Sequence, residues 1–97
     1  MDFEFDPAKS ATNYDKHGID FVEAQGLWDG KARERPLSYP REDRFLRIGM
    51  LRERLWAAVF ILRGERVRLI SVRRARRREE AEYERETRKV RWDDHEP

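Results

Sequence analysis

The chain has 97 residues and no cysteine, and 43% of its residues are charged although its formal net charge is only +2. This length suits one domain, expected over residues 1–92 with a disordered tail over 93–97, and the lack of cysteine excludes disulfides and thiolate metal sites. No segment reaches the roughly 20 apolar residues of a membrane span, and the acidic start MDFEFD does not resemble a signal peptide. We therefore expect a soluble, cytoplasmic protein that binds no membrane.

The charges are distributed unevenly along the chain. Residues 1–30 contain seven acidic residues and two lysines, whereas residues 63–78 contain eight arginines and one glutamate. The planar guanidinium group suits contacts with phosphate or carboxylate, so this clustering favours a polyanion or an acidic protein as partner. A GC-rich genome explains a high ratio of arginine to lysine, but it does not explain the clustering.

The first thirty residues predict a short strand followed by two helices. In the first helix, Asp6 is placed to cap, Pro7 fits the first helical position and Gly18 fits a left-handed stop. Asp20, with Glu23 three residues later, has the spacing of a capping box and predicts the start of a second helix.

The remainder predicts an antiparallel sheet and a last helix. Residues 31–40 contain two prolines and are expected to be a loop or an edge strand. Alternation in RFLRIGML indicates a strand with one buried face, and the continuous apolar run RLWAAVFIL indicates a strand covered on both faces. The turn RGE and the strand RVRLISV complete a hairpin, and residues 74–91 are strong helix formers. The expected fold class is α+β, with two N-terminal helices, an antiparallel sheet and a C-terminal helix.

Five of the six residues 73–78 are arginine, at the expected start of the last helix. The helix dipole disfavours each cation there by about 0.3–1 kcal/mol, and Arg73/Arg77 and Arg74/Arg78 are like-charged neighbours at the i,i+4 spacing. Broken local rules often mark a functional site, and an anion near the helix start would compensate. The alternative interpretation is a solvated charged face. Because residues 74–91 contain few apolar side chains, a partner chain is expected to complete this helix.

Few residues are available for catalysis. His17, at the end of the first predicted helix, is either a helix-end cation or a proton donor and acceptor near neutral pH. The sequence contains no metal-ligand cluster, so we expect no metal and no cofactor; Glu79 and Glu80 alone make a weak magnesium site. RNA carries its own nucleophile, the 2′-OH, and needs only alignment, charge stabilisation and proton transfer. His17 or Glu79 can move the proton. The candidates for binding phosphate are Arg73, Arg74, Arg77 and Arg78.

Two stretches, FEFDPAKSATNYDKHGIDFVEA and LISVRRARRREEAEYE, together resemble the BrnT family of bacterial type II toxins. The family pattern has a helix ending in Lys-His-Gly, then Phe-Glu-Glu-Ala, and later Ile-Ser-Ala-Arg with a Glu and a Tyr downstream. The resemblance covers about residues 3–85. The matching residues are Asp6, Lys9, Asn13, Lys16, His17, Gly18, Phe21, Arg44, Ile48, Gly49, Val59, Phe60, Ile70, Ser71, Arg73, Ala75, Glu79 and Tyr83.

The resemblance implies a RelE-like fold, metal-independent ribonuclease activity and growth arrest through loss of translation. It also implies a BrnA-like antitoxin, a heterotetramer with that antitoxin, and contact with operator DNA only through the complex. The catalytic candidates are then His17, Arg73, Arg78 and Glu79, and the RNA-binding candidates are Lys16, Arg44, Arg74, Arg77 and Tyr83.

Several of these residues also have ordinary structural interpretations. Tyr83 suits a core anchor of the last helix, Lys16 a helix-end cation, Arg44 a solvated strand end, and Glu79 a carboxylate paired with a nearby arginine.

Two other functions use the same arginines. A non-catalytic RNA- or DNA-binding module would bind with an affinity that falls steeply with salt and would release no cleavage product. The small number of acid–base residues keeps this alternative open. A protein-interaction subunit would use the arginines to meet an acidic partner.

Overall fold

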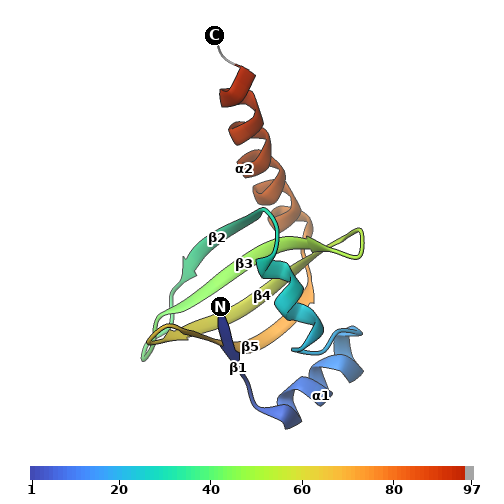
Figure 1. Cartoon of the computed structure of the whole chain (residues 1–97), viewed down its shortest axis with the longest axis vertical. Helices are drawn as coiled ribbons and strands as arrows, with labels where there is room; N and C mark the ends of the chain where they lie inside the picture. Colours follow the sequence, from blue (N-terminus) through green and yellow to red (C-terminus); the bar gives the residue numbers. More distant parts are fainter. Residues whose placement is uncertain (96–97) are drawn as a thin grey trace.

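The computed structural model describes the backbone of residues 1–95 and the side chains of residues 1–88. One five-stranded sheet, with the order β1-β5-β4-β3-β2, forms its centre (Figure 1). In chain order the elements are β1 (Asp2–Glu4), α1 (Pro7–His17), the 3₁₀ helix η1 (Glu23–Trp28), β2 (Ala32–Leu37), β3 (Arg44–Leu51), β4 (Arg54–Arg63), β5 (Arg66–Arg74) and α2 (Arg77–His95). The α+β class is therefore confirmed.

The sheet is antiparallel except for β1, which pairs with β5 in parallel. The apolar run of β4 lies at its centre and is covered on both faces, as predicted. On the η1 face, the segment around η1 packs Phe21 and Leu27 against Phe60. On the α2 face, Ala75 and Tyr83 pack against a smaller cluster, which comprises Leu46, Ile48, Ala57 and Val59.

Both predicted N-terminal caps are present, but the second helix is of a different kind. Asp6 accepts a hydrogen bond from the Ala8 backbone at 2.8 Å, and Gly18 ends α1 with φ of 77°. The Asp20–Glu23 capping box also forms, with bonds of 2.8 and 3.2 Å. It leads into the six-residue 3₁₀ helix η1 rather than into an α-helix.

The spacing of the buried residues explains the 3₁₀ geometry. Phe21, Ala24 and Leu27 are at most 1% exposed and recur every three residues. Side chains three residues apart align in a 3₁₀ helix, whereas an α-helix would rotate them away from the sheet.

The edge strand and the last helix differ in detail from the prediction. Residues 32–37 form an edge strand, which tolerates the missing N–H of Pro36. α2 begins at Arg77 rather than at residue 74, because Arg73 and Arg74 still pair with β4. The predicted disorder of residues 93–97 stays a prediction, since residues 96–97 and the side chains beyond Arg88 lie outside the described part. No helix in the described part of the chain has the length and apolar composition that a bilayer crossing requires.

A buried asparagine fixes α1 to the open edge of β5. β1 pairs only with residues 66–68 of β5, so the edge farther along has no neighbouring strand. There the Asn13 amide donates to the Val72 and Ile19 carbonyls at 2.8 Å each and accepts from the Val72 N–H at 3.1 Å. Asn13 is only 6% exposed and satisfies the backbone as a further strand would.

We predict that Asn13→Ala lowers the free energy of unfolding by about 2–4 kcal/mol, because it leaves buried backbone groups without partners. Urea denaturation monitored by circular dichroism measures the change. Thr12→Ala is the matched control, since the Thr12 hydroxyl bonds only the Ala8 carbonyl of its own helix. Equal stability of the two variants would contradict this role of Asn13.

Candidate functional site

The arginine cluster is divided among three elements of structure. Arg73 and Arg74 are the last residues of β5, Arg76 lies in the connection, and Arg77 and Arg78 open α2. The Ala75 N–H donates to the Leu55 carbonyl at 2.9 Å, which extends the pairing with β4 by one bond. The guanidinium groups therefore do not form a single helix face.

Arg73 and Glu79 form a bidentate ion pair. The two terminal nitrogens of Arg73 donate to the two Glu79 oxygens at 2.7 and 2.9 Å, and Glu79 is only 4% exposed. Glu79, the third residue of α2, also accepts a hydrogen bond from the Arg76 N–H at 2.8 Å. The third helical residue makes the same bond in a capping box.

These contacts determine the charge of Glu79. The hydrogen bonds from Arg73 hold the pKa of the Glu79 carboxyl below its usual value, with the Arg76 backbone bond and nearby positive charge adding to them against the opposing effect of burial. The same hydrogen bonds raise the pKa of the Arg73 guanidinium. Two of the four predicted catalytic residues thus bind each other and connect β5 to α2.

The other cluster arginines face solvent. Arg74, Arg76, Arg77 and Arg78 are exposed, and Arg74 lies over the Trp56 ring at 5.7 Å. Among the described side chains, no carboxylate lies within ion-pair distance of Arg77 or Arg78. Both guanidinium groups can therefore bind an external anion.

Lys16 and His17 lie at the end of α1 and line an open groove against β5. Ile70 and Ser71 form the β5 side of this groove. α1 lies beside β5, and α2 follows the end of β5 (Figure 1). His17 thus lies in the groove beside the middle of β5, Arg77 and Arg78 follow the end of β5, and Arg74 lies over Trp56 of the η1-face cluster.

Arg44 lies outside this region. It pairs with Ile61, whereas Arg73 pairs with Ala57, so the two arginines are four residues apart along the strands, or about 13 Å. The Arg44 guanidinium lies 4.3 Å from the Tyr39 ring centroid and 2.6 Å from Glu42.

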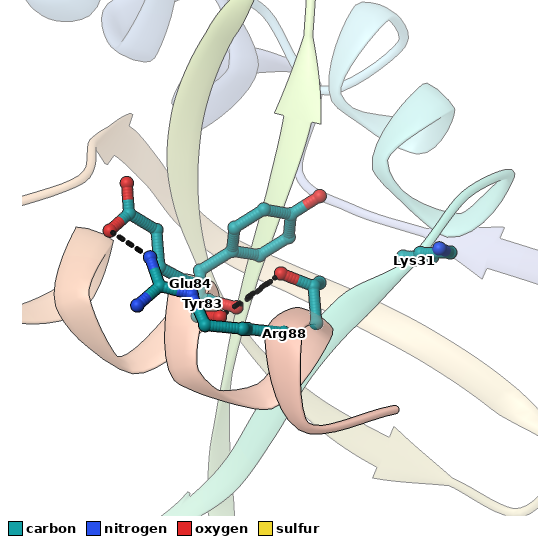
Figure 2. Close-up of a pocket in the computed structure, with 5 residues that line it drawn as sticks. Lys31, Tyr83, Glu84 and Arg88 are labelled. Carbon is teal, nitrogen blue, oxygen red and sulfur yellow. Dashed lines mark hydrogen bonds and ion pairs between the residues drawn. The ribbon is translucent and has the colours of Figure 1, made fainter. Parts of the chain in front are cut away.

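Tyr83 is a core anchor, as its structural interpretation predicted. Its half-buried ring packs against the apolar cluster of the α2 face. Figure 2 shows the ring extending from α2 across the sheet, whereas Glu84 and Arg88 pair on the surface of the helix at 3.8 Å.

Sequence reasoning missed an ion-pair network beneath α2. Arg35 of β2 donates to Glu82 at 2.8 and 3.2 Å, and these hydrogen bonds raise the pKa of the Arg35 guanidinium. Arg33 lies 3.9 Å from Glu82 and 3.8 Å from Glu86. The only sequence signal was the alternation of arginines in an edge strand, which does not specify a partner 47 residues away.

No set of three or more His, Asp or Glu side chains within the described part of the chain is placed to hold a metal ion. Both oxygens of Glu79, which sequence analysis considered with Glu80 as a weak magnesium site, are occupied by Arg73.

We predict that Glu79→Gln lowers the free energy of unfolding at pH 7 by about 2–4 kcal/mol, because it leaves the Arg73 charge without its partner. Since the pKa of Glu79 is depressed in the folded state, its contribution is present above the ordinary value of 4.5 and is lost as the pH falls through the folded value. The difference between wild type and variant should therefore shrink below about pH 4.5.

Urea denaturation at pH 7 and at pH 3 measures both effects. Glu84→Gln is the matched control, since its carboxylate is 65% exposed and its pair with Arg88 is loose. A difference of the same size at both pH values would contradict the stabilising role of the ion pair.

Comparison with known proteins supplies the family. A family model described as "Ribonuclease toxin, BrnT, of type II toxin-antitoxin system" matches residues 5–79, which is more than half of the chain. No curated protein matches the sequence. The match includes α1, strands β2 to β5 and the first residues of α2, whereas β1 lies just before it, and it confirms the resemblance seen in the sequence. The chain belongs to the BrnT family of ribonuclease toxins of type II toxin-antitoxin systems.

Proposed function

We propose that this toxin is an endoribonuclease that uses the 2′-OH of its RNA substrate as nucleophile and needs no metal ion. Cleavage of RNA arrests translation. The observation that carries the proposal is that one strand, β5, borders the groove that contains the exposed His17 and leads into the helix start that carries the exposed Arg77 and Arg78. Family membership supports ribonuclease activity in general. We also propose that the fold is RelE-like.

The reaction needs one group that moves protons and several that stabilise charge. The 2′-oxygen forms a bond to phosphorus while its proton leaves, and the bond from phosphorus to the 5′-oxygen breaks as that oxygen takes up a proton. The products are a 2′,3′-cyclic phosphate and a 5′-hydroxyl. Because the added charge develops on the phosphate oxygens, nearby guanidinium groups lower the barrier.

We assign the proton transfers to His17 and not to Glu79. Imidazole is the side chain that exchanges protons most readily near neutral pH, and His17 is exposed in the groove. Glu79 is held ionised by Arg73 and is buried, so it is a poor proton donor at pH 7.

Phosphate binding is assigned to the exposed cations. Arg78 and Arg77 open α2, where free backbone N–H groups also favour an anion, and Arg74 and Lys16 lie on the neighbouring elements. Arg73 is assigned a structural role, since both of its terminal nitrogens already bind Glu79. Arg44 and Tyr83 have no part in this assignment.

The family implies an antitoxin partner. We propose a BrnA-like protein that covers the exposed arginines with an acidic or amphipathic segment and so excludes RNA. The two proteins form a heterotetramer, and operator DNA is contacted through the antitoxin. The exposed, cationic guanidinium groups of Arg77 and Arg78 support an acidic partner.

We predict that purified protein, free of any copurifying partner, cleaves 5′-labelled RNA in EDTA to products ending in 2′,3′-cyclic phosphate. Matched DNA stays intact because it lacks the 2′-OH. His17→Gln should slow cleavage by about 100-fold or more, and Arg78→Ala by about 10-fold or more, with the fold unchanged. Both free RNA and ribosome-bound mRNA are tested.

The matched control is Arg63→Ala. Arg63 is an exposed arginine in the β4–β5 hairpin, at the end of β4 that lies away from α2. It should cleave at the wild-type rate. Intact RNA bound in a salt-dependent manner would identify a non-catalytic binding module instead. Full activity of a folded His17→Gln variant would remove the assignment of His17.

A further inference from the structure

The groove between α1 and β5 has features that the proposed proton transfer does not use. It has a volume of about 300 Å³, at the lower end of small-molecule sites, which suits one nucleotide rather than folded RNA. The lining residues that matter here are Ala8, Lys9, Lys16, His17, Ile70 and Ser71.

A β-bulge shapes the β5 side of the groove. Phe60 of β4 pairs with Leu69 and Val59 pairs with Ser71, so Ile70 is the extra residue. Consecutive strand residues normally point to opposite faces, yet Ile70 and Ser71 both line this groove. Bulges re-aim side chains in this way and are frequent beside functional sites.

The charges in the groove favour an anion. Lys9 and Lys16 are two helical turns apart on α1, about 10 Å along its axis, and both line the groove. His17 adds an imidazole to these two ammonium groups, and no aspartate or glutamate is among the lining residues. A phosphate group is therefore favoured over a cationic ligand.

The uncharged part of the groove suits a nucleobase. Ala8 and the half-buried Ile70 offer an apolar surface. The Thr12 hydroxyl is occupied by the Ala8 carbonyl and the Asn13 amide by the backbone. Among the described residues, the Ser71 hydroxyl makes no hydrogen bond to the protein and is free to bond a ligand.

We propose that this groove holds one nucleotide of the RNA, next to the phosphate that is cut. The base of this nucleotide lies on Ala8 and Ile70, and the Ser71 hydroxyl bonds the edge of the base. Lys9 binds the phosphate of the same nucleotide. This subsite rests on the proposed function in taking RNA as its ligand. It makes Ser71 a specificity residue and Lys9 a binding residue, whereas His17 moves the proton.

Cleavage kinetics on RNAs that differ in one base beside the cut test the subsite. Lys9→Ala should raise KM by about 5–10-fold and leave kcat unchanged, because a charge-assisted contact to phosphate is lost. Ser71→Ala should change the preference among the four bases by about 3–10-fold, the worth of one hydrogen bond. Lys31→Ala is the matched control, since this exposed lysine lies beside Tyr83 and α2, outside the groove.

A titration of ¹⁵N-labelled wild-type protein with each of the four nucleoside 3′-monophosphates gives a second measurement. The amide signals of Ile70 and Ser71 should shift, and the shifts should weaken in a Lys9→Ala, Ser71→Ala double variant that keeps the wild-type spectrum elsewhere.

The outcomes separate the subsite from the proposed function. Wild-type KM and base preference in both folded single variants would overturn the subsite while the ribonuclease assignment stands. If wild-type protein cleaves no RNA, the proposed function fails and the titration alone decides the subsite. Absence of shifts at millimolar mononucleotide would then overturn it.

Discussion

The ion pair between Arg73 and Glu79 holds the functional end of the molecule together. α2 begins with two arginines and follows a third, and the helix dipole disfavours positive charge at this end. An anion near the helix start would compensate for this repulsion. The first such anion is Glu79 itself, which neutralises Arg73 and accepts the Arg76 N–H at the start of α2. Because both Glu79 oxygens bind Arg73, this compensation does not extend to the arginines beyond it. These remain exposed, so an excess of positive charge stays at the start of α2.

β5 organises the rest of the site. Its first residues pair with β1, its middle carries the bulge, and its last residues lead through Ala75 into α2. The short length of β1 leaves an open edge on which α1 lies, fixed by Asn13. One strand thus positions the helix that carries His17, the bulge that shapes the groove and the helix that presents Arg77 and Arg78. The acidic residues among the first thirty contribute structure through caps and ion pairs.

The sequence predicted what local patterns encode. The Asp20–Glu23 capping box, the β4–β5 hairpin and the edge strand with Pro36 are all present, because caps, turns and alternation act over a few residues. The capping box predicts a helix start but not the helix type, and the three-residue spacing of the buried residues makes the second helix a 3₁₀ helix. Val72, which bonds Asn13, is 59 residues away and Glu82, which bonds Arg35, is 47 residues away, and no local signal identifies such pairs. The sequence indicates candidate residues for the site, but which of them bind each other depends on where β5 ends and α2 begins.

If the Arg73–Glu79 pair is structural, catalysis depends on groups outside it. A double variant, Arg73→Met with Glu79→Gln, removes both charges together, and glutamine can still accept the Arg76 N–H in the helix cap. The decisive quantity is its rate of RNA cleavage, measured once circular dichroism and urea denaturation show a folded protein. We expect a rate within about threefold of wild type. A folded double variant that is as inactive as His17→Gln would contradict the structural role and would place the ion pair in the chemistry.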